Sequence, residues 1–286
     1  MLQAIIDSLV SGMIYSLVAL GFALVYNSTK VFHVAAAAVY VLAAEVFYDL
    51  SQVSTMKMPL LLAALIAILM AMAVSLAMEW LVYRPLKRRG ASNNVSLVAS
   101  IGMMTVIINL LALFFYKSSK PFVRPFEDDV LITTPQLLEL VVGGFVAAAF
   151  LLFVLKSRWG IKLKAMSDNP VLFETMGNNV SAMRTWVFLL SGAIIAIASC
   201  LSAYDLGVES GNGFMMLTYA MVAMIVGGSG RYWTCLAGGL LLGFLQEMVG
   251  SAGLSGGWKD GVTFLLLLLF LFLRPQGLAG YKQRTV

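Results

Sequence analysis

The chain has 286 residues, of which 60% are hydrophobic and only 12% are Lys, Arg, Asp or Glu. A typical soluble domain is about half apolar and about a quarter charged. One bilayer crossing needs roughly 20 apolar residues, so the composition can fill about eight or nine membrane helices. It excludes a soluble enzyme, a disordered chain and a disulfide scaffold. The net charge of +5 does not indicate nucleic-acid binding, because the basic residues lie in short loops between apolar runs.

Apolar runs predict the membrane spans in chain order, and the fold class is therefore an all-α polytopic membrane protein with one transmembrane domain over residues 1–286. The runs at 34–50 and 213–229 are short for full crossings, so we expect broken or re-entrant helices there. The spans lie near residues 3–26, 34–50, 59–83, 95–116, 137–155, 185–204, 213–229, 233–250 and 261–273.

Loop charges predict the orientation. With the basic loop 84–94 in the cytoplasm, nine alternating spans put most of the 19 Lys and Arg residues inside. Cytoplasmic loops carry the excess of basic residues, so the N-terminus is expected outside and the C-terminus inside. A re-entrant segment counted as a crossing would reverse part of this assignment.

The longest inside segment, 156–184, contains a predicted helix. Asp168 or Asn169 can cap its start, with Pro170 in the first turn and Gly177 as a stop signal. We therefore expect a short cytoplasmic helix between two membrane spans.

The predicted helix is amphipathic, because Leu172, Phe173 and Met176 are expected on one face. This apolar face can lie on the membrane interface. It can equally insert into a groove on a soluble partner. The composition alone does not separate these two interpretations.

The same segment resembles the cytoplasmic coupling region of branched-chain amino-acid-type ABC importer permeases, which carries a G-x-x-x-R/K-A-x-x-x-[DN]-P-x-x-A-x-x-x-G pattern. Together with four other stretches, the similarity spans nearly the whole chain. The matching residues are Gly160, Lys164, Ala165, Asn169, Pro170 and Gly177, and the other stretches are 79–89 (E-W-L-V-Y-R-P-L-K-R-R), 98–102 (V-A-S-I-G), 227–243 and 273–280 (L-R-P-Q-G-L-A-G).

The resemblance implies the permease fold of type II ABC importers, in a bacterial or archaeal inner membrane. It implies two permease chains, two ABC ATPase subunits and an extracytoplasmic solute-binding protein, with no cofactor in this chain. ATP would be hydrolysed on the separate subunits, and the solute would be a small amino acid or a related amide or urea-like compound. By this resemblance, the residues expected to dock the ATPase are Lys164, Asp168, Asn169, Pro170, Leu172, Phe173, Met176 and Gly177.

One stretch departs from the family. Its usual N-F-A-H-G sequence after the first span is here His33-Val34-Ala35-Ala36-Ala37, so the Asn position is His33 and the His and Gly positions are alanines. If this stretch lines the pathway, its polarity has changed. That puts direct transfer of a leucine-type substrate in question.

The energy source must lie outside this chain, because no G-x-x-x-x-G-K-[ST] phosphate loop occurs in the sequence. The chain is therefore not expected to be an enzyme. The alternative is an ion-coupled secondary transporter, which would be expected to place several titratable groups within the membrane. His33, Glu45 and Glu247 are the candidates in apolar runs.

Four residues are candidates for the substrate pathway: His33, Tyr40, Glu45 and Asn109. A charge within the bilayer normally faces a cavity or a partner, although Glu45 could also lie at the outer interface. His33 could instead bond to the loop at 27–30. Asn109 could link two helices rather than line the path.

The sequence also contains a short internal similarity. Ser11-Gly12-Met13-Ile14 resembles Ser191-Gly192-Ala193-Ile194, and the two spans are predicted to run in opposite directions. This is the arrangement of an inverted repeat, which is common in transporters.

Overall fold

The computed structural model describes residues 2–53, 57–115, 121–122, 132–209, 211–228, 230–251, 253, 257–274 and 277–278. Most of them are helical, as the sequence predicts. Seven helical segments in this part of the chain are long and apolar enough to cross a membrane. The predicted cytoplasmic C-terminus, residues 279–286, lies outside the described residues.

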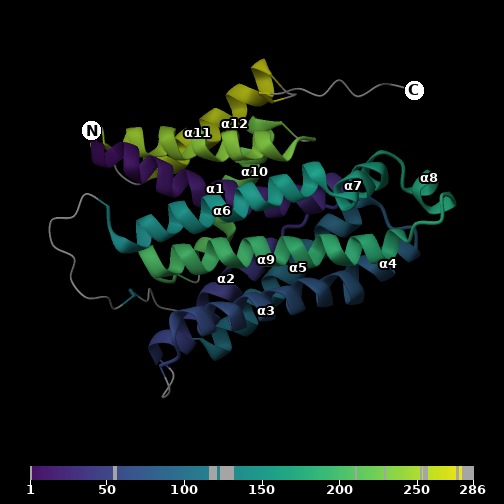
Figure 1. Ribbon diagram of the computed structural model, residues 1–286, viewed down its shortest axis with the longest axis horizontal. Coiled ribbons are helices and arrows are strands. Elements are labelled where there is room, and N and C mark those ends of the chain that lie inside the picture. The colour runs from purple at the N-terminus through teal and green to yellow at the C-terminus, as the bar shows by residue number, and fades with distance from the viewer. Residues whose placement is uncertain are drawn as a thin grey trace.

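The helices lie side by side along the long axis of the molecule (Figure 1). They are α1 (Leu2–Thr29), α2 (Ala36–Tyr48), η1 (Asp49–Val53), α3 (Leu60–Met78), η2 (Glu79–Tyr83), α4 (Arg84–Arg88), α5 (Asn93–Phe114), α6 (Thr134–Lys156), α7 (Arg158–Asp168), α8 (Pro170–Thr175), α9 (Val180–Leu206), α10 (Asn212–Gly227), α11 (Tyr232–Ser251) and α12 (Gly257–Leu273).

The first short helix, α2, follows a re-entrant segment. After α1 the chain turns back, and the Phe32 ring lies 5.2 Å from Phe22 and 5.7 Å from Tyr26, both on α1. The turn therefore carries the residues before α2 back along α1. Helix α2 continues into η1, and the segment Ala36–Val53 is one of the seven that are long and apolar enough to cross a membrane, so the prediction of a run too short for a full crossing is wrong here.

The second short helix, α10, begins in a related way. A Cβ added at Gly213 would lie only 2.8 Å from the carbonyl oxygen of Ala37, so the start of α10 packs directly on the first turns of α2. Ser199 of α9 bonds to Tyr40 near the start of α2, and α9 then continues to Leu206, beyond the start of α2. The chain therefore folds back between Leu206 and Asn212 before α10 starts.

The two halves pack as the predicted inverted repeat requires. Helices α1 and α9 run antiparallel (Figure 1). Gly12 on α1 faces the backbone of α11, whereas Gly192 on α9 faces α3. Helix α10 contacts α1 and α11, and α2 correspondingly contacts α9 and α3. Both glycines allow a close helix approach that a side chain would block.

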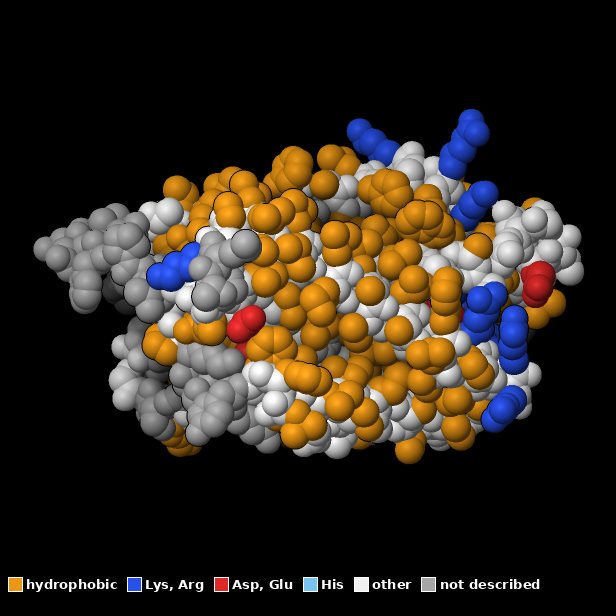
Figure 2. All heavy atoms as spheres, turned by 90° about the horizontal axis from the view of Figure 1, so that it is seen from below, with side chains coloured by type: hydrophobic (Ala, Val, Ile, Leu, Met, Phe, Trp, Pro, Cys, Tyr) orange, Lys and Arg blue, Asp and Glu red, His pale blue; other side chains and the backbone are white. Residues whose placement is uncertain are grey.

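The outer helices present apolar faces. Little of α3, α5 and α6 is buried, whereas α1, α2 and α9 are largely buried. Figure 2 shows the hydrophobic side chains as a broad belt, with Lys and Arg side chains gathered at the end where α4, α7 and α8 lie. This distribution fits a bilayer around the belt and water at the basic end.

Candidate translocation and coupling sites

A chain of hydrogen bonds holds the re-entrant segment in front of α2. His33 Nδ1 lies 2.8 Å from the Tyr83 hydroxyl, which donates to Ser100 Oγ, also at 2.8 Å. Ser100 Oγ in turn accepts the backbone N–H of Ala35 at 2.9 Å. Because Ala35 precedes α2 and has no capping side chain of its own, α5 supplies an oxygen at this helix start.

The network joins two of the stretches that carry the family resemblance, 79–89 and 98–102, to the stretch 33–37, which departs from the family. His33 is 1% exposed, and its ring lies 5.2 Å from the Phe188 ring. It bonds across to η2 rather than to the loop at 27–30. Sequence reasoning missed the roles of Tyr83 and Ser100, although both are polar side chains in motifs that it singled out.

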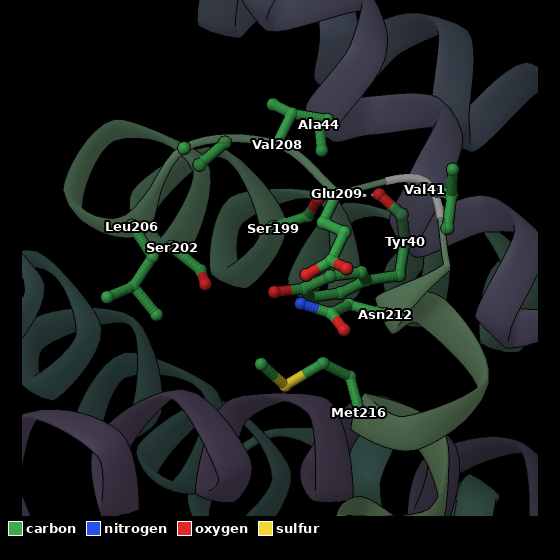
Figure 3. A pocket seen from close by; sticks show the side chains of 12 residues that line it. Tyr40, Val41, Ala44, Ser199, Ser202, Leu206, Val208, Glu209, Asn212 and Met216 are labelled. Atoms are coloured by element: carbon green, nitrogen blue, oxygen red, sulfur yellow. Dashed lines mark hydrogen bonds between the residues drawn. The ribbon is translucent and has the colours of Figure 1, made fainter. Parts of the chain in front are cut away.

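Tyr40 lies on α2 at a cavity of about 180 Å³ between α2, α9 and the start of α10. Figure 3 shows the side chains of Tyr40, Glu209 and Asn212 gathered in it. Ser199 Oγ donates to the Tyr40 carbonyl oxygen at 2.5 Å and so holds α2 against α9. The lining residues are Tyr40, Val41, Ala44, Ser199, Ser202, Ala203, Leu206, Gly207, Val208, Glu209, Asn212 and Met216.

The other two pathway candidates lie apart from this cavity. Glu45 is 1% exposed within α2, and its neighbour Ala44 lines the cavity in its place. Asn109 is exposed on α5, where its Nδ2 donates to the Thr105 carbonyl oxygen of the same helix at 2.7 Å. Among the described residues, no three His, Cys, Asp or Glu side chains are grouped to hold a metal ion.

The predicted coupling segment forms two helices, α7 and α8. Asn169 caps α8, since its Oδ1 accepts the N–H of Leu172 at 3.0 Å, whereas Asp168 is the last residue of α7. Gly177 has φ +79°, and the N–H of Asn178 reaches the carbonyl oxygen of Phe173. This is the Schellman stop that a glycine favours.

The expected apolar face of α8 needs one correction. Phe173 is only 4% exposed and packs into the core of the chain, whereas Leu172 is 56% and Met176 73% exposed. Adjacent helical residues point about 100° apart, so Phe173 can pack inward while Leu172 points outward. The exposed face instead comprises Val171, Leu172 and Met176.

Helix α7 fixes α8 to the bundle. Ser167 Oγ donates to the Asn27 carbonyl oxygen at the end of α1, at 2.6 Å. A Cβ on Gly160 would lie 1.8 Å from the Val154 carbonyl oxygen of α6, so a glycine is required at this corner. Lys164 is exposed on α7, while Leu163 and Met166 are buried.

A buried ion pair, absent from the sequence predictions, lies beside this anchor. Arg184 in the first turns of α9 is 4% exposed, and its Nε lies 3.1 Å from Glu79 Oε1. Its Nη2 donates to Glu79 Oε2 at 3.3 Å. The pair therefore connects η2 to the helix that follows α8. The two residues are about a hundred positions apart, which explains why spacing did not reveal them.

The fold and these sites define a class: an all-α, multi-pass membrane protein with a polar re-entrant segment and a helix pair attached at its basic end. Comparison with known proteins gives the family. Residues 4–271 match the family described as branched-chain amino acid transport system / permease component. The chain belongs to this family of ABC importer permeases.

Individual relatives agree with this assignment. The chain is 29% identical to the high-affinity branched-chain amino acid transport system permease protein BraD of Pseudomonas aeruginosa, over 98% of this chain and 95% of BraD. It is 28% identical to the corresponding protein LivH of Escherichia coli, with the same shares covered. The solved structure of PsaBC from Streptococcus pneumoniae has a TM-score of 0.51 at 15% identity, covering 94% of this chain and 91% of that chain. The last likeness concerns the fold alone.

Proposed function

We propose that this chain is the transmembrane permease subunit of an ATP-driven importer for small amino acids or related small organic solutes such as amides and urea-like compounds. ATP is hydrolysed on separate subunits, and this chain is neither an enzyme nor a cofactor carrier. Family membership supports transport through an ABC importer. The narrower solute class rests on the cavity described below.

The proposed assembly contains a second permease chain, two ABC ATPases and an extracytoplasmic solute-binding protein. Its orientation puts the N-terminus outside, with α4, α7, α8 and the C-terminus in the cytoplasm. The gathering of Lys and Arg side chains at the α8 end supports this orientation (Figure 2). The apolar outer faces of α3 and α5 leave room for the second permease chain.

The observation that carries the proposal is the exposed face of α8. Val171, Leu172 and Met176 are 72%, 56% and 73% exposed. The preceding helix, α7, is fixed to α1 by the Ser167 hydrogen bond and to α6 by the close backbone approach at Gly160. An exposed apolar helix face suits insertion into a groove of a soluble ATPase. Because α7 fixes α8 to the bundle, a movement of the ATPase is then transmitted to the membrane helices.

The experiment changes this face without touching the core of the chain. We expect Leu172→Asp with Met176→Asp to abolish co-purification of the ATPase and solute-stimulated ATP hydrolysis, because two charges would be buried without partners. Phe173 is left intact because it packs inside this chain. Val53→Asp is the control, since Val53 is 62% exposed at the end of η1, away from α8.

The docking assignment is wrong if the double variant retains the ATPase. Uptake that survives removal of the ATPase would overturn the ATP-driven function itself and favour an ion-coupled secondary transporter. That rival would use buried titratable groups such as His33 and Glu45.

The proposed pathway includes the cavity at Tyr40. A volume of about 180 Å³ corresponds to about six water molecules, which favours small solutes over bulky ones. Its lining combines Tyr40 and Ser202 hydroxyls with the Asn212 amide and the Glu209 carboxylate, which can bond polar solute groups. His33 and Glu45 would shape α2 beside it, and Asn109 would join the pathway where a second permease covers α5.

A further inference from the structure

A second hollow lies at the opposite end of the bundle from the Tyr40 cavity, beside the coupling helices. It has a volume of about 100 Å³ and opens where α1 ends, between α4, α7 and the start of α9. Its lining residues are Ser28, Thr29, Lys30, Lys87, Met166, Ser167, Pro170, Val180 and Arg184.

The lining contains three cations and no acidic residue. Arg184 is the buried one, and the carboxylate of Glu79 outside the hollow already balances its charge. Lys30 and Lys87 are exposed, and neither forms an ion pair within the described part of the chain. Two lysine ammonium groups from different elements therefore line one small space whose own lining has no acidic residue; the nearest carboxylates that act on Lys87, those of Glu79 and Glu174, lie outside it.

The backbone at Lys30 points to a role for its side chain. Lys30 has φ +57° and follows directly on the last residue of α1, and its N–H bonds to the Tyr26 carbonyl oxygen. Glycine is the usual residue at such a left-handed helix end, because a Cβ is disfavoured there. A lysine at this position keeps a cation at the hollow despite the backbone cost.

The hydroxyl groups of the lining already donate their protons elsewhere. Ser28 donates to the Leu24 carbonyl oxygen at 2.6 Å, and Ser167 to that of Asn27 at 2.6 Å. Thr29 donates to the Val25 carbonyl oxygen at 2.7 Å. Binding of a ligand here would therefore depend on the cations, which favours an anion over a neutral solute.

The volume and the location of the hollow restrict which kind of anion can bind there. A space of about 100 Å³ corresponds to about three water molecules, which suits a phosphate group and not a larger acidic side chain with its backbone. The hollow is lined in part by α4 and α7, which lie at the basic end of the apolar belt, where the headgroups of a surrounding bilayer would be (Figures 1 and 2). Basic pockets between membrane helices at this level bind anionic headgroups.

We propose that the hollow between α1, α4, α7 and α9 binds a phosphate group, carried by an anionic phospholipid or present as free phosphate. Lys30 and Lys87 hold the phosphate oxygens, and Arg184 supports them from the buried side. The bound group bridges the end of α1 to α4, next to the Ser167 anchor of the coupling helices. It would stabilise the position from which α8 meets its partner.

The test measures lipid retention by the purified full-length chain in detergent, using native mass spectrometry with phosphatidylglycerol or phosphatidylcholine added. We expect selective binding of phosphatidylglycerol, weakened roughly thirtyfold in Lys30→Gln/Lys87→Gln. Arg88→Gln/Arg89→Gln is the matched control, because it removes two charges from exposed residues at the end of α4 that do not line the hollow. A thermal melt of each variant checks that folding is unchanged.

Added inorganic phosphate distinguishes the two sources of the phosphate group, a phospholipid headgroup and the free ion. Displacement of the lipid by millimolar phosphate means that the hollow accepts the free ion as well, whereas retention of the lipid assigns it to the headgroup. Equal losses in both double variants would overturn the proposal, since any surface charge would then suffice. Equal binding of the two lipids with no effect of phosphate would overturn it as well.

Discussion

The two re-entrant segments of this permease each lie beside a hollow, and the two hollows differ in charge. The first, after α1, is lined by Lys30, Lys87 and Arg184. The second, after α9, contains Glu209, Asn212 and Tyr40. The two hollows are lined by different elements, the first by α1, α4, α7, α8 and α9 and the second by α2, α9 and the start of α10. The contrast in charge therefore follows from which segments meet at each end of α9.

The hollows also differ in how they are supported. Around the first, a buried ion pair and the His33–Tyr83–Ser100 chain connect η2, α5 and α9. Around the second, Ser199 bonds to the α2 backbone, while Glu209 and Asn212 are exposed. We therefore expect substitutions near the first hollow to lower stability and those at the second to change transport.

The largest effect is expected at the buried ion pair. Arg184→Gln leaves the Glu79 carboxylate buried without its partner and should lower the free energy of unfolding by about 3–5 kcal/mol. Thermal unfolding in detergent measures this loss. Arg158→Gln, on the exposed first residue of α7, should change it little. A double Glu79→Gln/Arg184→Gln variant as unstable as the sum of the two single variants would show that the pair is not coupled.

A smaller loss is expected in the hydrogen-bond chain. Ser100→Ala deprives both the Ala35 N–H and the Tyr83 hydroxyl of their acceptor, at a cost of about 1–3 kcal/mol. Ser96→Ala is the matched control one turn earlier on α5, since the Ser96 hydroxyl donates to the carbonyl oxygen of Ser92, the residue that caps the start of the same helix. Equal melting temperatures for the two variants would contradict a supporting role for Ser100.

The smallest effect on stability is expected at the second hollow. Glu209→Gln should change the free energy of unfolding by no more than about 0.5 kcal/mol, because the side chain is exposed. Uptake of an ammonium-bearing solute such as alanine should fall, while uptake of a neutral amide should not. Glu209→Asp keeps the charge and serves as control. Unchanged alanine uptake in Glu209→Gln would show that the cavity is not part of the transport pathway.

The sequence predicted the helical bundle and the short helix α10 well, because span length follows directly from apolar runs. It also placed the stop at Gly177 and narrowed the cap to Asp168 or Asn169, of which the structure has Asn169, because both features depend on neighbouring residues only. It was wrong about the first short run, because α2 continues into η1 and Ala36–Val53 is long enough to cross a membrane. It misjudged the face of Phe173, since the rotation of a one-turn helix is set by what the helix packs against. The sequence could not predict the Glu79–Arg184 ion pair, because the two residues lie on segments far apart in the chain.

The re-entrant segment before α2 constrains how the protein is made. When this stretch leaves the ribosome, neither Tyr83 nor Ser100 has yet been synthesised, and His33 and the Ala35 N–H have no partners in lipid. The hydrogen bonds that hold the segment can therefore form only after η2 and α5 have been made. An early part of this permease thus depends on later helices for its final contacts.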